Sequence, residues 1–341
     1  MNIRRDVHLR DYSTMRLGGS AAYLIDIHSP QELAEAAQWA DNASLPIIMV
    51  GGGSNIIWSD GGFSGLVMVD KILGFNEVIT GDEHIVTIGA GEQWDHIVAR
   101  TAKQGLSGIE ALSLIPGTAG ATPIQNVGAY GQEISSTLVK AEAYDHKIKQ
   151  FVTLKSADFQ FGYRTSQLKT GQRGRYFITS ITLRLHSTNP TSPFYPDVQA
   201  YFDEHSINKP TPQTLREAVV AIRSKKLPDP AIIANSGSFF ANPTIPKQHF
   251  AKLAASYPTL PHWQLKDGSI KLPAAWLLEQ AGFRGIHDQR TGMATWPSQA
   301  LVLVNEHASS TAQLLSFRNQ IIAKVQALFD ITLTQEPELL P

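Results

Sequence analysis

Residues 115–133 read IPGTAGATPIQNVGAYGQE, and this stretch governs how the first half of the chain is expected to fold. Four glycines stand among small and apolar residues, and Pro123 prevents a regular helix through the middle. Ordered backbone N–H groups in such a loop can line a nucleotide, and the side-chain amides of Gln125 and Asn126 add donors for polar rings. A set of purely structural glycine turns between strands is the alternative interpretation.

A second glycine-rich stretch, GGGSN at Gly51–Asn55, follows PIIMV at Pro46–Val50, a run typical of a buried strand. Glycines there permit positive φ and let the backbone approach a phosphate. The stretch is not a Rossmann fingerprint, because Ile56 occupies the third glycine position, and it is not a Walker A loop, because no Gly-Lys-Ser/Thr is present. Alone it is more often a tight turn, but two such loops after strands favour a dinucleotide.

Short β-type runs alternate with helical ones along the chain, which predicts a mixed α and β fold. Capping residues and apolar spacing predict a helix that begins after Ser29 and ends at Asp41–Asn42. The same signals predict further helices at Trp94–Lys103, from Pro212 to about Arg223, at Lys271–Ala281 and at Ser310–Phe329. Content of β-branched and aromatic residues predicts strands at Pro46–Val50, Leu66–Val69, His84–Ile88, Val139–Tyr144, Phe151–Leu154, Tyr176–Leu185, Ala300–Val304 and Ile331–Thr334.

Composition bounds the class of protein. A length of 341 residues with 43% hydrophobic and 17% charged residues predicts two or three folded domains. A formal net charge of −1 argues against a general nucleic-acid binder. The absence of cysteine excludes disulfides, thiolate metal sites and a cysteine nucleophile, and the 11 histidines show no metal-ligand spacing, so no metal is expected.

The chain carries no targeting signal that its sequence reveals. Met1–Arg10 has no apolar segment behind its charges, as a signal peptide would have. The longest aliphatic runs fall far below the ~20 residues of a membrane span. A soluble, cytoplasmic protein is therefore expected.

Residues 235–243, NSGSFFANP, place Ser238 between Gly237 and the pair Phe239–Phe240. One interpretation is a turn next to a patch of the core. The other is a hydroxyl that is held dry and directed at a reacting atom. The residues by themselves leave both interpretations open.

These three stretches occur in order with FGYRTS at Phe161–Ser166, KKLPDP at Lys225–Pro230 and EPEL at Glu336–Leu339. Together they resemble the UDP-N-acetylenolpyruvoylglucosamine reductase (MurB) family of bacterial cell-wall synthesis. The resemblance spans nearly the whole chain, and its specific parts are the glycine stretch of residues 115–133 and GSFF with the following Asn-Pro, whereas GGGSN alone is not specific. It implies an α+β fold with an FAD-binding domain of the vanillyl-alcohol-oxidase type, made of two α/β subdomains, and a C-terminal α+β substrate domain.

The resemblance also implies how the chain is divided. Residues 1–225 are expected to bind FAD, with a small N-terminal subdomain over about 1–70 and a larger one over about 71–225. Residues 226–330 are expected to bind substrate. Residues 331–341 are expected to form a tail that returns to bring Glu338 into the cleft between the two parts.

The activity implied is the reduction of an enolpyruvyl ether of a UDP-sugar to a lactyl ether, with non-covalent FAD as cofactor and NADPH as co-substrate. Ser238 matches the family's proton donor, Arg164 its active-site arginine and Glu338 its catalytic glutamate. A serine is a weak acid, but the carbanion left by hydride addition is a strong base, so a well-placed hydroxyl suffices. The two phenylalanines after Ser238 are expected to exclude water.

Binding residues follow from the same resemblance. The residues implied for FAD are Gly51, Gly52, Gly53, Ser54, Asn55, Gly117, Gly120, Ala121, Thr122, Gln125, Asn126, Gly128, Tyr130 and Gly131. Those implied for substrate or NADPH phosphates are Tyr195, Arg223, Lys226 and Asn242. The proline-rich loop around Tyr195 is similar to the long-loop form of the family, in which this loop closes over the uridine diphosphate. No nucleic acid, membrane or obligatory protein partner is implied.

Two features depart from the family pattern and keep two alternatives open. Thr165 stands where the family usually has aspartate, and Met293–Pro297 is atypical where many members carry a histidine. One alternative is an alcohol or hydroxy-acid oxidase with the same FAD-binding fold, against which GSFF and EPEL argue. The other is a nucleotide-binding module without catalytic activity.

Overall fold

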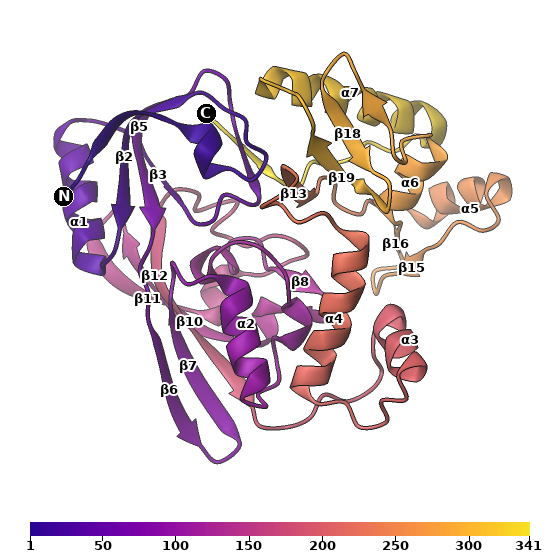
Figure 1. The fold of residues 1–341 in the computed structure, drawn as a ribbon, viewed down its shortest axis with the longest axis horizontal. Helices are drawn as coiled ribbons and strands as arrows, with labels where there is room; N and C mark the ends of the chain where they lie inside the picture. Colours follow the sequence, from indigo (N-terminus) through magenta and orange to yellow (C-terminus); the bar gives the residue numbers. More distant parts are fainter. The chain divides into compact units, whose positions relative to one another are not determined.

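Contacts within the chain divide residues Met1–Pro341, all of which the computed structural model describes, into two units. Unit 1 comprises Met1–Val7, Ala21–Gly53 and Phe63–Ser224, and unit 2 comprises His8–Ser20, Ser54–Gly62 and Lys225–Pro341. Two short segments from early in the chain, His8–Ser20 and Ser54–Gly62, thus belong to unit 2, although the division by sequence assigned them to the FAD-binding region. Figure 1 follows the chain from indigo to yellow.

The first sheet of unit 1 is mainly parallel and carries one helix. Its strand order is β1 (Arg4–His8), β2 (Ser20–Ile27), β5 (Phe63–Asp70) and β3 (Ile47–Val50), with β2 and β3 parallel to β5. Helix α1 (Pro30–Asn42) begins after Ser29, whose hydroxyl accepts the amide of Glu32 at 3.1 Å, as the capping signal predicts. Its buried residue Leu33 lies in one cluster with Ile25 and Met68 of the sheet. Figure 1 shows α1 beside this sheet.

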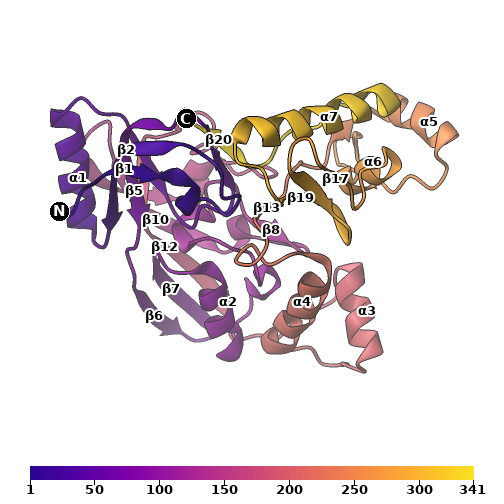
Figure 2. The same cartoon turned by 45° about the horizontal axis from the view of Figure 1, so that its top comes forward.

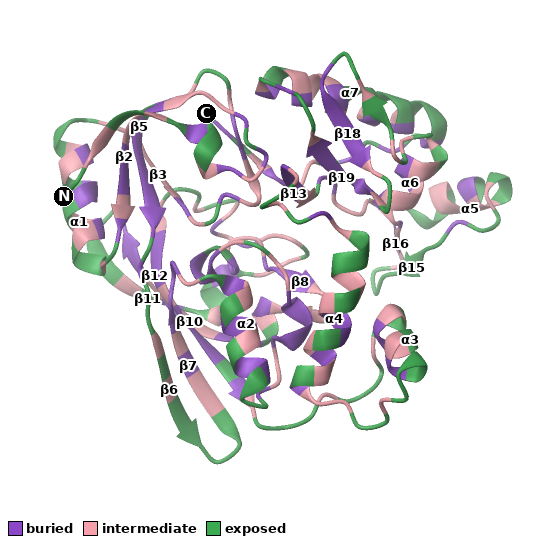
Figure 3. Ribbon diagram, in the orientation of Figure 1, coloured by how far each residue is buried: buried purple, intermediate pink, exposed green.

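The second sheet of unit 1 is antiparallel. Its strand order is β11 (Gln150–Lys155), β10 (Leu138–Asp145), β12 (Tyr176–His186), β7 (Glu83–Gly89) and β6 (Phe75–Thr80). Helix α2 (Trp94–Lys103) buries Trp94 and Ile97 in one cluster with Ile181 and Leu183 of β12. The edge strand β6 is largely exposed (Figure 3).

Two further helices and a small hairpin complete unit 1. Helices α3 (Pro196–Glu204) and α4 (Pro212–Lys226) share a separate apolar cluster that includes Val198, Phe202 and Leu215. The hairpin of β8 (Gly128–Ala129) and β9 (Gln132–Glu133) lies within the glycine stretch of residues 115–133.

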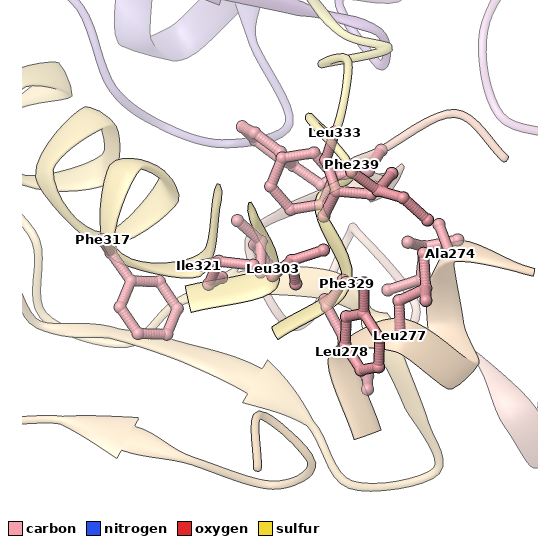
Figure 4. Packing of buried hydrophobic residues seen from close by; sticks show 14 of the residues in the cluster. Phe239, Ala274, Leu277, Leu278, Leu303, Phe317, Ile321, Phe329 and Leu333 are labelled. Carbon is pink, nitrogen blue, oxygen red and sulfur yellow. The ribbon is translucent and has the colours of Figure 1, made fainter. Parts of the chain in front are cut away.

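Unit 2 is built on an antiparallel sheet with the order β13 (Asn235–Ser238), β19 (Gln299–Asn305), β18 (Met293–Trp296) and β17 (His287–Asp288). Neighbouring side chains on a strand point to opposite faces. Leu301 and Leu303 of β19 therefore join the cluster of helices α6 (Ala274–Gln280) and α7 (Thr311–Phe329), while Val302 joins a second cluster with Leu227. Figure 4 shows part of the larger cluster, and Figure 2 shows α7 along the sheet.

The remaining elements of unit 2 are short. A three-stranded sheet has the order β14 (Thr244–Ile245), β16 (Ile270–Lys271) and β15 (Trp263–Gln264), and helix α5 (Lys247–Ser256) follows β14. Strand β4 (Ile56–Trp58) pairs in parallel with β20 (Glu338–Leu340), so a segment from early in the sequence and the last strand meet within this unit.

Most predicted elements are confirmed, and two predictions need correction. The helix predicted at Lys271–Ala281 begins only at Ala274, because Ile270–Lys271 pairs in β16 and Pro273 is the helix N-cap. The strand predicted at Ile331–Thr334 is wrong: Ile331 and Leu333 are buried in alternation, but the segment forms no ladder, and the last strand is β20. Alternating burial therefore reflects packing against the core here and not strand pairing.

None of the helices combines the length and the apolar character that crossing a bilayer requires.

Candidate active site

The two glycine loops, far apart in the sequence, lie against each other in unit 1. A Cβ on Gly51 would come within 2.1 Å of the Thr118 Oγ1 atom, and a Cβ on Gly52 within 2.9 Å of the Gly117 Cα atom. A Cβ on Gly120 would lie 2.5 Å from that of Ala90. Only glycine permits such approach of one backbone to the other, so the loops form one structure rather than two independent turns.

Backbone donors in these loops differ in how they are used. The amides of Ala119 and Gly120 donate to carbonyls of Glu92 and Ala90, and those of Ala121 and Thr122 to carbonyls within the loop. The consecutive glycines 51–53, in contrast, have amides with no acceptor in the chain, and Gly53 has a φ of +66°. Successive N–H groups of this kind form a concave site for anions, which fits the diphosphate of a dinucleotide such as FAD.

Asn126 connects the glycine loop of residues 115–133 to the FGYRTS segment. Its side chain is buried with a φ of +50°, and its amide nitrogen donates to the Glu133 Oε2 atom at 2.9 Å and to the Gly162 carbonyl at 3.1 Å. Its carbonyl oxygen accepts the amide of Ser135 at 3.1 Å. The resemblance implies that this side chain binds FAD, whereas three of its hydrogen bonds are made within the protein. Glu133, which accepts one of them, was not among the predicted residues, because the sequence offers no separate signal for it.

Arg164 sits at the turn of a tight hairpin that Gly162 and Thr165 close by mutual backbone hydrogen bonds. Its φ of +54° lies in the left-handed region, which costs a non-glycine residue free energy and is typical of functional positions. The guanidinium Nη2 atom donates to the carbonyl of Gly128 at 2.6 Å. A backbone carbonyl of the glycine loop therefore orients this arginine.

Arg223 and two tyrosines gather near the same hairpin. The Nε atom of Arg223 is fully enclosed and has no hydrogen-bond partner. Burial lowers the pKa of this guanidinium, the charge of Arg164 lowers it further, and the side chains of Tyr130 and Asp95 oppose the shift. Tyr130 also contacts Tyr195 edge to face, with ring centroids 5.4 Å apart. Two cations and an unsatisfied donor make this part of unit 1 suited to an anionic ligand.

Ser238 lies at a bulge at the end of β13. Asn235 pairs with Val304 of β19, and Ser238 pairs with Val302. Three residues along β13 therefore lie opposite two residues along β19. Gly237 has a φ of +68°, and the Asn235 Oδ1 atom accepts its amide at 2.9 Å. The bulge re-aims the side chain that follows it, and Ser238 is exposed.

The two phenylalanines after Ser238 serve the core. Phe239 and Phe240 are 0% and 1% exposed and join the large apolar cluster of unit 2, as Figure 4 shows for Phe239. Both rings lie in this core while Ser238 is exposed, and the expected exclusion of water from Ser238 stays a prediction. They fix the strand that carries it.

The C-terminal segment passes beside Ser238. The amide of Ala241 donates to the carbonyl of Thr334, and the amide of Glu336 donates to that of Phe239 at 2.9 Å. The amide of Glu338 then donates to the carbonyl of Asn55 at 2.9 Å, where β20 begins. Unit 2 thus brings three predicted site residues together: Ser238, Glu338 and Asn55.

The other predicted residues have varied places. Lys226 is exposed at the end of α4, and Asn242 uses its Oδ1 atom to accept the Ala274 amide at 2.9 Å, at the first turn of α6. Thr122 is buried and donates its hydroxyl to the carbonyl of Ala119. Ser54 and Gln125 are half-buried, whereas Ala121 and Gly131 are exposed. No group of three acidic or histidine side chains could hold a metal ion.

Comparison with protein families gives this geometry its class. A model described as an FAD binding domain matches residues 21–147, and a model described as the C-terminal domain of UDP-N-acetylenolpyruvoylglucosamine reductase matches residues 229–340. The chain is therefore an FAD-dependent oxidoreductase with a separate C-terminal domain, and the predicted α+β class is confirmed.

Individual relatives extend the match to the full chain. Proteins named UDP-N-acetylenolpyruvoylglucosamine reductase are 40% identical in Cupriavidus pinatubonensis, over 97% of both chains, and 40% identical in Ralstonia nicotianae, over 96% of both. The crystal structure of the Thermus caldophilus enzyme shares the fold, with a TM-score of 0.69 over 100% of both chains at 22% identity. The chain belongs to the UDP-N-acetylenolpyruvoylglucosamine reductase family.

Proposed function

We propose that this protein reduces UDP-N-acetylglucosamine enolpyruvate to UDP-N-acetylmuramate with NADPH, in the supply of peptidoglycan precursors in a bacterial cytoplasm. The observation that carries the proposal is the end-to-end similarity to curated proteins of this name, together with the pairing of GSFF and EPEL through the Glu336 amide and the Phe239 carbonyl. FAD, when bound, supplies the hydride chemistry that links the two substrates.

Ser238 is proposed to supply the proton. Reduction of the enolpyruvyl alkene adds a hydride to one carbon and a proton to the next, which lies beside a carboxylate. The exposed hydroxyl stands on a strand held on one side by β19 and on the other by the C-terminal segment. A rigid support matters because a weak acid transfers its proton only when it is well placed.

Arg164 and Glu338 are proposed to act on the substrate carboxylate. Negative charge builds there as the carbanion forms, and a guanidinium fixed on the Gly128 carbonyl needs no reorganisation to stabilise it. Glu338 is proposed to polarise the carboxylate or orient the other groups from its place at the start of β20. The positive φ of Arg164 costs free energy, and a functional role of this residue explains why such a conformation is kept.

Phosphates are proposed to bind at the remaining predicted sites. Arg223 and Tyr195, with Tyr130 between them, suit the diphosphate of the UDP-sugar, and Lys226 and Asn242 stay candidates for the same ligand or for NADPH. The two glycine loops are proposed to hold FAD. We assign FAD binding to residues 1–225, substrate binding to 226–330 and the support of Glu338 to the tail 331–341.

Two half-reactions test the proposal on one sample. The purified protein should show the visible absorbance of flavin and release FAD on denaturation. NADPH should bleach that absorbance without oxygen, and UDP-N-acetylglucosamine enolpyruvate should restore it. An oxidase would regain its colour with oxygen but not with this substrate, and a binding module would not bleach; either outcome would reject the proposed reaction.

A further inference from the structure

A chain of side-chain hydrogen bonds connects helix α7 to the segment that carries Glu338. The Nη1 atom of Arg318 donates to the Oε1 atom of Gln335 at 2.7 Å. The Nε2 atom of Gln335 in turn donates to the carbonyl of Pro337 at 2.7 Å. Both bonds are short, and together they reach the peptide bond that joins Pro337 to Glu338.

On helix α7, the series of hydrogen bonds begins at Arg318, whose guanidinium has further hydrogen bonds. The other edges of the Arg318 guanidinium donate to the Oδ1 atom of Asn319, from Nε at 3.1 Å and from Nη2 at 2.9 Å. Helix α7 itself is anchored at its first turn, where Asp60 accepts the amides of Thr311 at 2.6 Å and Ala312 at 2.9 Å. The guanidinium of Arg318 is therefore held by hydrogen bonds to Asn319 and to Gln335 on a helix that is anchored at its start.

At the other end of this series of hydrogen bonds lies the peptide group between Pro337 and Glu338. Backbone hydrogen bonds fix the segment at Glu336, through Phe239, and again at Glu338, through Asn55. Pro337 lies between them and has no N–H to donate. Its carbonyl is oriented by the side chain of Gln335, which Arg318 holds.

We propose that Arg318, acting through Gln335, is a positioning residue for Glu338. The inference rests on the proposed function, because Glu338 must act in the substrate half-reaction for its position to matter. Gln335 transmits the position only as an amide: its oxygen accepts from Arg318 while its nitrogen donates to Pro337. Neither Arg318 nor Gln335 is proposed to touch the substrate.

The substitution Gln335→Glu separates the two links. The carboxylate still accepts a hydrogen bond from Arg318, but it can no longer donate to the Pro337 carbonyl. We expect Gln335→Glu and Arg318→Ala each to slow reoxidation of reduced flavin by UDP-N-acetylglucosamine enolpyruvate about tenfold, the cost of one hydrogen bond. Reduction by NADPH and the KM for the substrate should stay within about twofold of the wild-type values.

A double-mutant cycle with Glu338→Gln shows whether the effect passes through Glu338. If it does, Arg318→Ala should cause no further loss once Glu338 is replaced. An equal loss in both backgrounds would overturn the inference and leave the role of Glu338 intact. A Glu338→Gln variant with a normal substrate half-reaction would overturn the inference together with that part of the proposed function.

Hydrogen exchange provides a readout independent of activity. Arg318→Ala and Gln335→Glu should raise the exchange rate of the Glu338 amide about tenfold while the melting temperature stays near that of the wild type. The matched control is Lys324→Ala, which removes an exposed positive charge from the same helix. Unchanged exchange at Glu338 in both test variants would overturn the inference.

Discussion

Ser238 shows how a single residue is prepared by its neighbours. Gly237 adopts a left-handed conformation, Asn235 fixes the turn, and Phe239 and Phe240 anchor the next residues in the core. The hydroxyl therefore stands exposed on a strand that has little freedom to move. Its position, rather than its acidity, is what a proton transfer would use.

Replacing Ser238 with alanine should separate the two half-reactions. Reduction of FAD by NADPH should stay within about twofold of wild type, and reoxidation by the enolpyruvyl substrate should slow by about a hundredfold or more, the size of a general-acid contribution. Stopped-flow absorbance of the flavin measures both steps.

The matched control is Ser236→Ala. Ser236 lies on the same strand, and its buried hydroxyl has no hydrogen-bond partner, so its loss should cost nothing. A Ser238→Ala enzyme whose second step is as fast as that of the control would refute the proton-donor role.

Asp70 carries a pH dependence of stability. Burial at the end of β5 raises the pKa of its carboxyl to about 7, although the Ile72 amide, at 3.0 Å from Oδ1, opposes the shift. Between the ordinary pKa of 3.8 and about pH 7, the folded chain therefore keeps a proton on Asp70 that the unfolded chain has lost. Stability falls as the pH rises between these values, and the full cost is present above about pH 7.

Asp70→Asn should remove this dependence, because asparagine still accepts the Ile72 amide and cannot ionise. We expect the variant to be more stable than wild type at pH 8, by at most about 4 kcal/mol, and to gain only about 1 kcal/mol at pH 4.5. Urea denaturation at both values measures the difference. An equal difference at the two pH values would show that the charge of Asp70 is not its source.

At the scale of elements, the two glycine loops act as one. There is no room for a Cβ on Gly51 or Gly52, where the loop of residues 51–55 meets that of residues 115–133, or on Gly120, where the latter packs on Ala90. Contact between the loops therefore depends on glycine at positions 51 and 52, and a change there should disturb the other loop.

Gly120→Ala should weaken FAD binding at least about tenfold, because its Cβ would lie 2.5 Å from that of Ala90 and the loop must shift. Fluorescence titration with FAD measures the affinity. Adding Ala90→Gly removes the clashing atom and should restore much of the affinity. The control Gly61→Ala, where the nearest atom is 3.8 Å from the new Cβ, should bind FAD as wild type does. Unchanged affinity of Gly120→Ala would count against the loop as a cofactor site.

At the scale of the whole molecule, unit 2 is built from three separate segments of the chain. Met15, Leu17 and Ile57 lie in the same apolar cluster as Phe239 and Phe317. Strand β20 pairs with β4, and Asp60 caps helix α7. The C-terminal part therefore depends on segments from the beginning of the sequence.

A fragment of residues 225–341 should fail to fold alone. It lacks the partner strand of β20, the cap of α7 and part of the core, which together exceed the marginal stability of a small domain. A proton–nitrogen NMR spectrum should show collapsed amide shifts and thermal unfolding should lack a cooperative transition, in contrast to the full chain. A dispersed spectrum would show that the early segments are dispensable.

The sequence by itself determined the elements whose signals are local. Ser29 with Pro30, and Ser310 with Gln313, mark helix starts correctly, because capping acts within one turn. The sequence also indicated the family and its cofactor, because these depend on the order of short stretches that the chain retains. It could not reveal that Phe239 and Phe240 belong to the core, since burial depends on which distant segments meet.

Tertiary structure alone decided how the candidate site is held. The carbonyl of Gly128 orients Arg164, and the carbonyl of Asn55 holds Glu338. Any residue type offers such a carbonyl, so no pattern in the sequence marks it. The same reason explains the misplaced last strand: alternation at Ile331–Thr334 indicates burial, but pairing needs a neighbouring backbone, and β4 offers it only to Glu338–Leu340.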